Sequence, residues 1–455
     1  MDTPNGRLYS GATAEQVRKD LSRFVDFKSE GICLVDINKM INEKLVPHLM
    51  KYDSPGFLSM FNTLPESGAM LGAAAALEYN QGVTNWQVSP GGAMLEELCC
   101  KALCRLFGLS DNADATFMYC GTYANQAAIY LALHKKAEDE GFDLAQKGVN
   151  GFKVPSDLAL ITTYDAHFSV RHAVRMLGLG EESLVFVNVD KHRRMDIDHL
   201  QSTIKSIRGH KDIFCVLATA GTTSAGAVDP VLEIARICKE NDIWLHADGA
   251  YGLAYSLIPG KKQLFEGIEL ADSLSWDPHK QSSVSIPNSV LFVRNSDDFK
   301  RMCLFSDYFN RDETEPNPGL KSPPSTRPFS ALVLCTSLLH QGMDKYVSNL
   351  NKPLNAIRQL YDLLKEDSET ELMHEPDTGV LCFRIIPESV PEDSLNDLQE
   401  YIYETIMAKG ESTVSLSAFD TKKVLRILSV NPKITFIDFK TAIQNIKAVA
   451  GSFIS

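Results

Sequence analysis

The segment IWLHADGAYGLAY at residues 243–255, followed by ADSLSWDPHK at residues 271–280, decides the expected fold. Its first residues form an apolar run that predicts a buried strand, and Asp248 stands at the carboxyl end of that strand. A second, shorter strand-like run leads into Asp277, and Lys280 follows three residues later. Ligands of open parallel sheets bind at the carboxyl ends of the strands, so Asp248 and Lys280 are expected on one rim.

Strand and helix patterns alternate on both sides of this segment, from about residue 90 to residue 295. Short apolar runs predict buried strands at residues 158–161, 184–187, 213–217, 243–245 and 290–293. A helix is expected in PVLEIARICKEN, where Pro230 takes the favoured first-turn position. The alternation predicts an α/β domain with a largely parallel sheet covered by helices.

The two ends of the chain follow other patterns. The first residues indicate helices and loops, which predicts an N-terminal helical arm. After the proline-rich segment ETEPNPGLKSPPSTRP come two strand candidates, VLCFRII near Val380 and VLRILSV near Val424, and then a final helix. We therefore expect an arm at residues 1–60, a large α/β domain at residues 61–335 and a small C-terminal α+β domain at residues 336–455.

Composition and charge exclude several classes of protein. With 44% hydrophobic and 23% charged residues among 455, the chain is expected to be globular rather than disordered. Its formal charge of −13 opposes binding to nucleic acid. The sequence has no apolar stretch of membrane-spanning length, and its start, MDTPNGRLYSGATAEQ, has no basic segment followed by an apolar one. We expect a cytoplasmic protein that does not bind membranes.

Ten scattered cysteines predict reduced thiols rather than a disulfide framework. Cys99, Cys100 and Cys104 form the main cluster, inside the amphipathic helix pattern LEELCCKALCRLFGL. Because no histidine follows at zinc-finger spacing, we expect these cysteines to pack in the core and predict no metal site.

A lysine and an aspartate on one rim match the needs of a particular cofactor. The amine of Lys280 can condense with an aldehyde, and Asp248 can keep a pyridine nitrogen protonated, which makes the ring an electron sink. Pyridoxal 5′-phosphate requires both roles. Taken singly, each residue is more often a solvated surface residue, so further motifs must decide.

Those motifs resemble one family. HADGAYG and DPHK look like segments of the group II pyridoxal-dependent decarboxylases, which include glutamate, aromatic amino-acid, cysteine-sulfinate and diaminobutyrate decarboxylases. SPGGAMLE, CGTYAN, DAHFSV and ATAGTTSAGAVDP, which begin at residues 89, 120, 165 and 218, are similar to family motifs in the same order. The resemblance spans roughly residues 55–445. It implies a fold-type I, aspartate aminotransferase-like architecture and α-decarboxylation of an amino acid to the amine and carbon dioxide.

The resemblance also implies roles for single residues. Lys280 is similar to the Schiff-base lysine, Asp248 to the aspartate at the pyridine nitrogen, and His167 to the histidine stacked on the ring. Further cofactor contacts are implied at Gly121, Thr122, Asn125, Thr223, Ala250 and His279, the first two at a helix N-terminus suited to phosphate. Arg327 in STRPFSAL is implied as the ligand of the substrate carboxylate, and Phe61 and Asn62 as substrate-side residues. Ordinary packing or capping is the alternative for each.

One region departs from the family pattern. Residues 311–326, RDETEPNPGLKSPPST, contain no tyrosine, whereas many members carry one there that donates a proton and reaches the neighbouring subunit's site. His167, water or another residue would then supply the proton; Tyr308 precedes the region but does not match the motif position. Members without this tyrosine can act as oxidative aldehyde synthases, so a decarboxylation-dependent oxidative deaminase stays open, as does a non-catalytic homologue. The expected partners are an amino-acid substrate and a second copy in a homodimer.

Overall fold

Two separate β-sheets organise the chain, whose computed structural model describes residues 6–28, 30–305 and 314–453. Contacts group the chain into two units. Unit 1 comprises Met1–Asn62, Asn355–Met373 and Val380–Ser455, and unit 2 comprises Thr63–Leu354 and His374–Gly379. The division into arm, large domain and small domain stays a prediction, because such contacts do not tell which segments fold alone.

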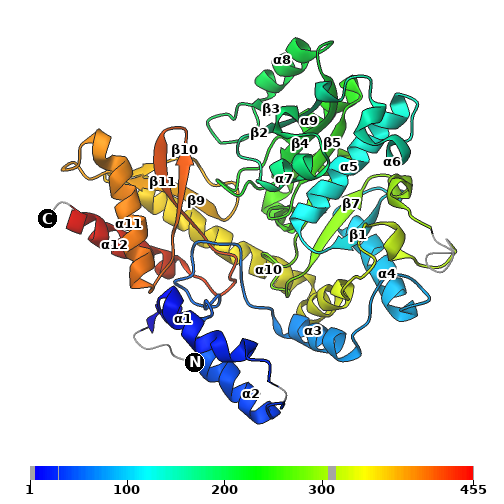
Figure 1. Cartoon of the computed structure of the whole chain (residues 1–455). Coiled ribbons are helices and arrows are strands. Elements are labelled where there is room, and N and C mark those ends of the chain that lie inside the picture. The colour runs from blue at the N-terminus through cyan, green and yellow to red at the C-terminus, as the bar shows by residue number, and fades with distance from the viewer. Residues whose placement is uncertain (1–5, 29, 306–313, 454–455) are drawn as a thin grey trace. The chain divides into compact units, whose positions relative to one another are not determined.

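Unit 2 is built on a seven-stranded sheet in the order β1-β7-β6-β5-β4-β2-β3 (Figure 1). Its strands are β1 Asp114–Met118, β2 Leu158–Thr163, β3 Leu184–Val187, β4 Asp212–Thr219, β5 Trp244–Asp248, β6 Ser273–Trp276 and β7 Ser289–Val293. The pairs β3/β2, β2/β4, β4/β5 and β5/β6 are parallel, while β7 runs antiparallel to both neighbours. This mostly parallel sheet confirms the predicted α/β class, and the five predicted apolar runs all lie in or overlap its strands.

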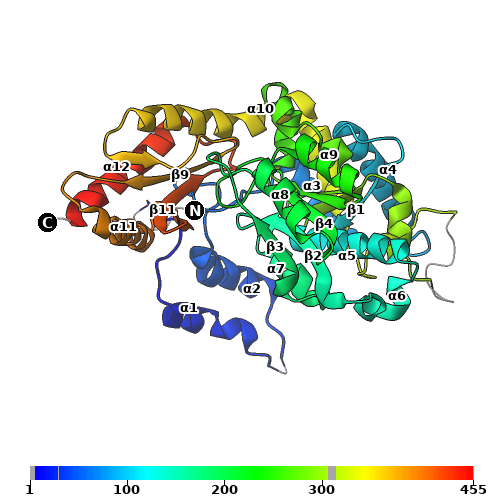
Figure 2. The same ribbon diagram turned by 90° about the horizontal axis from the view of Figure 1, so that it is seen from above.

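Helices cover both faces of this sheet, with α5 and α7 on one side and α8 and α9 on the other (Figure 2). The helices of unit 2 are α3 Ser67–Tyr79, α4 Pro90–Leu106, α5 Gly121–Asp139, α6 Leu144–Lys147, α7 Ser169–Met176, α8 Ile197–Ile207 and α9 Val231–Asn241. A longer helix, α10 Ser330–Lys365, is broken at Gly342 and continues into unit 1. Helix α5 packs across β4 to β7 through an alanine-rich buried face, which brings its first turn to the rim where β5 ends.

Unit 1 contains a four-stranded antiparallel sheet in the order β10-β11-β9-β8. Its strands are β8 Thr370–Leu372, β9 Val380–Ile385, β10 Ser415–Phe419 and β11 Lys422–Leu428, and its helices are α1 Ala14–Leu21, α2 Leu34–Met40, α11 Leu395–Lys409 and α12 Phe436–Phe453. Strands β9 and β11 confirm the two predicted C-terminal strands. The first residues of the chain also join this unit, since the Leu8 amide donates to the Gly410 carbonyl at 2.7 Å.

The cysteine cluster lies on α4, where Cys99, Cys100 and Cys104 are buried with free thiols. No helix within the described ranges has both the length and the apolar character to cross a membrane.

Candidate active site

A pocket of about 160 Å³ lies at the carboxyl ends of β4 and β5, beside the first turn of α5. It brings together most of the predicted cofactor residues, which are Gly121, Thr122, Asn125, His167, Thr223, Asp248, Ala250 and Lys280. Cys120, Thr219, Gly221, Tyr251 and Asp277 also line it, although the sequence reading gave them no role. The signal for Asp277 and Thr219 was available, since each stands at or directly after the end of a buried parallel strand.

The first turn of α5 offers room and hydrogen-bond donors for an anion. The first N–H groups of a helix have no partner inside the helix, and Cys120 at the N-cap position makes no side-chain capping bond. A Cβ atom on Gly121 would stand 2.8 Å from Asp277 Oδ2, which is too close for an unstrained contact. The position therefore favours glycine, the residue without a Cβ atom. Gly121 and Thr122 therefore suit the phosphate of the predicted cofactor.

Asp248 is held as a buried, ionised carboxylate. It accepts hydrogen bonds from the Ala250 amide at 3.0 Å and from Asn125 Nδ2 at 2.7 Å. Burial alone would raise the pKa of Asp248, but the charge of Lys280 and the Ala250 hydrogen bond outweigh it and hold that pKa below its ordinary value. A carboxylate in this state can keep a pyridine nitrogen protonated.

Lys280 meets a second buried carboxylate. Its Nζ lies 3.1 Å from Asp277 Oδ2, and Asp277 Oδ1 accepts from Ser289 Oγ at 2.6 Å. His279 does not line the pocket: its Nε2 lies 3.6 Å from the same Asp277 oxygen and its Nδ1 lies 2.6 Å from the Asn288 carbonyl oxygen. His279 is thus placed to pack beside Asp277 rather than to contact a phosphate.

His167 reaches the pocket as a neutral ring. The Ser169 amide donates to its Nδ1 at 3.2 Å, so the hydrogen of the neutral ring sits on Nε2. Burial lowers the pKa of His167, and the nearby Asp248 carboxylate offsets this only in part. Thr219 also lines the pocket, and its hydroxyl oxygen Oγ1 is buried. This oxygen has no hydrogen-bond partner among the described residues. An orphaned hydroxyl on the wall fits a pocket that receives a polar group.

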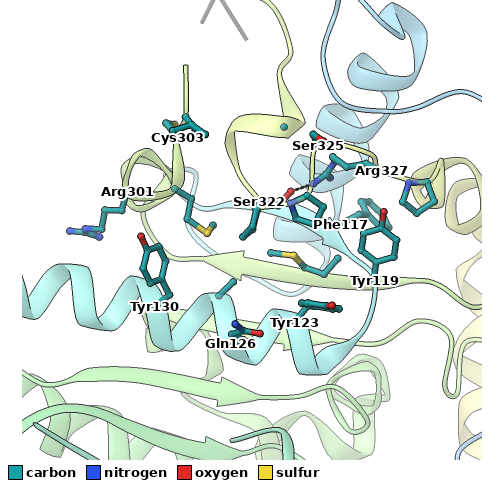
Figure 3. Close-up of a pocket in the computed structure, with 18 of the residues that line it drawn as sticks. Phe117, Tyr119, Tyr123, Gln126, Tyr130, Arg301, Cys303, Ser322, Ser325 and Arg327 are labelled. Atoms are coloured by element: carbon teal, nitrogen blue, oxygen red, sulfur yellow. Dashed lines mark hydrogen bonds between the residues drawn. The ribbon is translucent and has the colours of Figure 1, made fainter. Parts of the chain in front are cut away.

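The structure does not bring Arg327 into this pocket. Its guanidinium is buried and contacts Ser322 (Figure 3). It also contacts Glu96 and donates to the Val83 carbonyl and to Thr116 Oγ1, both at 3.1 Å. A charge already paired with a buried carboxylate is not available to a substrate, so this placement argues against the predicted carboxylate-binding role. Phe61 and Asn62 belong to unit 1, where the Phe61 ring lies 5.7 Å from the guanidinium carbon of Arg426.

A larger cavity of about 680 Å³ lies on a different face of α5 (Figure 3). Tyr123, Gln126 and Tyr130 of that helix line it, together with Tyr119 and the edge of Arg327. Neither Lys280 nor Asp248 borders this space. The groups suited to amine and pyridine chemistry therefore lie in the smaller pocket. A choice of site by cavity volume alone would have selected the larger cavity, which lacks these groups.

Comparison with known proteins agrees with this chemistry. Residues 25–386 match the model of the pyridoxal-dependent decarboxylase conserved domain. The chain is 27% identical over 458 residues to L-2,4-diaminobutyrate decarboxylase of Acinetobacter baumannii, covering 98% of this chain and 89% of the relative. It is 29% identical over 420 residues to aromatic-L-amino-acid decarboxylase of Bacillus atrophaeus, covering 90% of this chain and 84% of the relative.

Solved structures show the same fold. Mouse CSAD matches with a TM-score of 0.89 at 24% identity, covering 98% of this chain and 94% of that chain. The glutamate decarboxylase domain of a Vibrio parahaemolyticus protein matches with a TM-score of 0.87, also at 24% identity, covering 98% of this chain and 91% of that chain. Because the family match spans most of the sequence, the chain belongs to the pyridoxal-dependent decarboxylase family and is an amino-acid decarboxylase that depends on pyridoxal 5′-phosphate.

Proposed function

We propose that the chain removes the α-carboxylate of an L-amino acid to give the amine and carbon dioxide, with Lys280 as the covalent anchor of the cofactor. The observation that carries this proposal is the pocket that Lys280 shares with Asp248 and His167. Pyridoxal phosphate supplies an electron sink when bound, into which the electrons of the broken bond are drawn. The remaining tasks fall to side chains of the pocket.

Each pocket residue has one task in this proposal. The first turn of α5 at Gly121 and Thr122 binds phosphate, and the ionised Asp248 keeps the ring nitrogen protonated. Thr223 and Ala250 contact the cofactor from the wall, and Asp277 orients the Lys280 amine at 3.1 Å. His167 would supply a proton to the substrate from Nε2, and because its lowered pKa leaves the resting ring neutral, the ring would first take up a proton from solvent.

A second outcome is favoured by one specific observation. Residues 311–326 contain no tyrosine, and the described part of that stretch begins only at Thr314; Tyr308 lies outside the described residues. Without a fast proton donor, oxygen would accept the two electrons instead, and with water the products would be carbon dioxide, aldehyde, ammonia and peroxide. The alternative is therefore a decarboxylation-dependent oxidative deaminase using the same Lys280 and Asp248.

Two measurements test the proposal. Borohydride reduction of the holoenzyme followed by peptide mapping should place the pyridoxyl adduct on Lys280, and the adduct should vanish in Lys280→Ala but persist in the exposed control Lys262→Ala. An adduct on another lysine would remove Lys280 from the proposal. Amino acids are then screened for carbon dioxide release with amine, oxygen and peroxide measured in parallel. Amine equal to carbon dioxide supports the decarboxylase, and matching oxygen uptake supports the alternative.

We also propose a two-fold homodimer with a shared active site. Helix α3 leaves Leu71 and Leu77 exposed at 69% and 80%, and the N-terminal segment leaves Phe27 exposed at 90%. Exposed apolar side chains in such number are typical of an interface. Light scattering should give two copies, and Leu71→Glu with Leu77→Glu should reduce both dimer and activity. A fully active monomer would contradict this arrangement.

We place the protein in the cytosol for a chemical reason. None of the ten cysteines forms a disulfide in the described residues, although Cys215 and Cys238, both buried, lie near one another. Thiols persist unpaired in reducing compartments. Cell fractionation with a compartment marker tests this location, and recovery in an oxidising compartment would refute it.

A further inference from the structure

A chain of buried polar side chains runs away from the pocket behind Asp248. Asn125 Nδ2 lies 2.7 Å from Asp248 Oδ2, and Asn125 Oδ1 lies 3.0 Å from His246 Nε2. His246 Nδ1 lies 2.9 Å from Ser273 Oγ, which in turn lies 2.9 Å from Trp244 Nε1. These hydrogen-bonded side chains, here called the polar chain, join helix α5 to strands β5 and β6, and all of them are buried.

One end of this series of side chains can only donate a hydrogen bond and the other end can only accept one. The hydrogens between them therefore have a single arrangement. The indole of Trp244 can only donate, so Ser273 Oγ accepts from it and points its own hydrogen to His246 Nδ1. An ionised Asp248 can only accept, so Asn125 must present its amide nitrogen to it and its carbonyl oxygen to His246. Both constraints require the same His246 tautomer, with hydrogen on Nε2 donated to Asn125.

The charge state of His246 agrees with this arrangement. Burial lowers the pKa of His246 to about 4, although the Asp248 carboxylate acts to raise it. The ring is therefore neutral near pH 7. An added proton on Nδ1 would break the bond from Ser273, so the arrangement requires the neutral ring.

The side-chain amide of Asn125 makes its hydrogen bonds within the protein. Its two amide hydrogens reach Asp248 Oδ2 at 2.7 Å and Ser169 Oγ at 3.0 Å. Its carbonyl oxygen receives His246 Nε2 at 3.0 Å and has Ser275 Oγ at 3.1 Å. These neighbours occupy both amide hydrogens of Asn125, so we assign this residue a role toward Asp248.

We propose that Asn125, His246 and Ser273 are positioning residues that hold Asp248 as an acceptor aimed at the cofactor ring nitrogen. A carboxylate has about four acceptor sites; Asn125 and Ala250 take two of them, and Ser275 Oγ, 3.1 Å from both Asp248 Oδ1 and Asn125 Oδ1, shares its single hydrogen between the two oxygens. The remaining site faces the pocket that Asp248 lines. The polar chain fixes which oxygen and which lone pair the ring nitrogen meets, and it keeps the proton off Asp248. This inference rests on the proposed function, because it assumes the cofactor binds at Lys280.

The test compares His246→Leu and Asn125→Leu with the control His134→Leu. His134 is another buried histidine of unit 2, and it does not belong to the polar chain. Each holoenzyme is loaded with pyridoxal phosphate carrying ¹⁵N at the ring nitrogen, and the ¹⁵N resonance reports whether that nitrogen is protonated. We expect the resonance of a protonated ring nitrogen in the wild type and in His134→Leu. In His246→Leu and Asn125→Leu, we expect a shift toward the resonance of an unprotonated ring nitrogen. The kcat should fall about 10- to 100-fold in those variants, with KM little changed.

A gentler variant keeps the proposal testable where a leucine prevents folding. Ser273→Ala removes only one hydroxyl of the chain and should give a shift of the same sign but smaller size, whereas His246→Gln, which can still donate to Asn125, should restore part of the wild-type resonance. Protonated ring nitrogen in every chain variant, with kcat within about twofold of the wild type, would overturn the positioning role. Borohydride mapping to Lys280 in the same samples separates that result from failure of the proposed function.

Discussion

Replacing Arg327 by Met should destabilise unit 2 through Glu96 instead of weakening substrate binding. Arg327 and Glu96 are 4% and 2% exposed, and their side chains are in direct contact. Glu96 Oε1 also accepts from the Phe117 amide at 3.3 Å, while Oε2 has no partner among the described residues. Burial raises the pKa of Glu96, and the charge of Arg327 opposes that rise. Without the guanidinium, the carboxylate stays buried, with Lys321 as an opposing charge among the described residues.

The expected loss follows from what the variant leaves behind. Removing one partner of a buried ion pair costs about 3–5 kcal/mol of unfolding free energy, because the other charge stays buried. Glu96→Gln combined with Arg327→Met removes both charges and should recover most of that loss. Arg294→Met is the control: its contact with Asp272 is half-exposed, so its loss should stay within about 1 kcal/mol.

The loss in Arg327→Met should also depend on pH in a defined direction. Burial already raises the pKa of Glu96 in the wild type, and loss of the Arg327 charge should raise it further. The folded variant would then bind more protons than the unfolded chain, so its stability should fall as pH rises between the unfolded and folded pKa values. The slope approaches about 1.4 kcal/mol per pH unit in that window. The defect should therefore be smaller at about pH 5 than at about pH 8, and this dependence should disappear in the double variant.

Urea unfolding followed by circular dichroism measures these free energies, and steady-state kinetics of the holoenzyme supply KM and kcat. We expect Arg327→Met to change KM by less than about threefold in the fraction that remains folded. A KM raised more than about tenfold, with an unfolding free energy within about 0.5 kcal/mol of the wild type, would refute the structural reading and restore the substrate-binding role.

Further outcomes follow from the same structure. Because the folded-state pKa of His246 is lowered to about 4, the wild type should lose about 2 kcal/mol of stability between about pH 7 and pH 5 relative to His246→Leu, measured by urea unfolding. Gly121→Ala should weaken cofactor binding, measured by fluorescence titration, since its Cβ would stand 2.8 Å from Asp277 Oδ2. Asp248→Asn should keep the cofactor yet turn over poorly, and near-normal turnover would remove Asp248 from the electron-sink role. The buried thiols of Cys99, Cys100 and Cys104 should react with a thiol reagent only as fast as the protein unfolds.

The strands that carry the site could be predicted because their residues are buried on both faces. Strands β2, β4, β5 and β7 are almost wholly buried, so each appears in the sequence as a continuous apolar run. Strand β1 was missed because its sequence, DATFM, begins with Asp114, whose carboxylate bonds to Lys321 far along the chain. The edge strands β8 and β10 were missed because they are short or half-exposed.

Residue roles were harder to predict than positions. The motif order located eight of the nine predicted cofactor residues on one pocket, because motifs record which residues stand at strand ends and helix starts. A motif does not show which distant side chain a residue contacts. Arg327 meets Glu96 from 231 positions away, and Asn125 meets Asp248 from 123 positions away. The sequence could not show these protein partners, and the ligand contacts expected of both residues stay predictions.

This distinction changes how losses at the pocket should combine. Asn125 and Asp248 share one hydrogen bond of 2.7 Å, so a substitution at either position removes the same interaction. Their effects on kcat should then be strongly non-additive, as is general for groups that act as a unit. Asp277 has other neighbours. Lys280 forms an ion pair with it at 3.1 Å, and the backbone of Gly121 packs beside its carboxylate. The pocket thus has two carboxylates, one for the ring nitrogen and one for the amine. Because the charge of Lys280 also lowers the pKa of Asp248, only pairs that leave Lys280 unchanged, such as Asn125→Leu with Gly121→Ala, should come close to additivity across the two carboxylates.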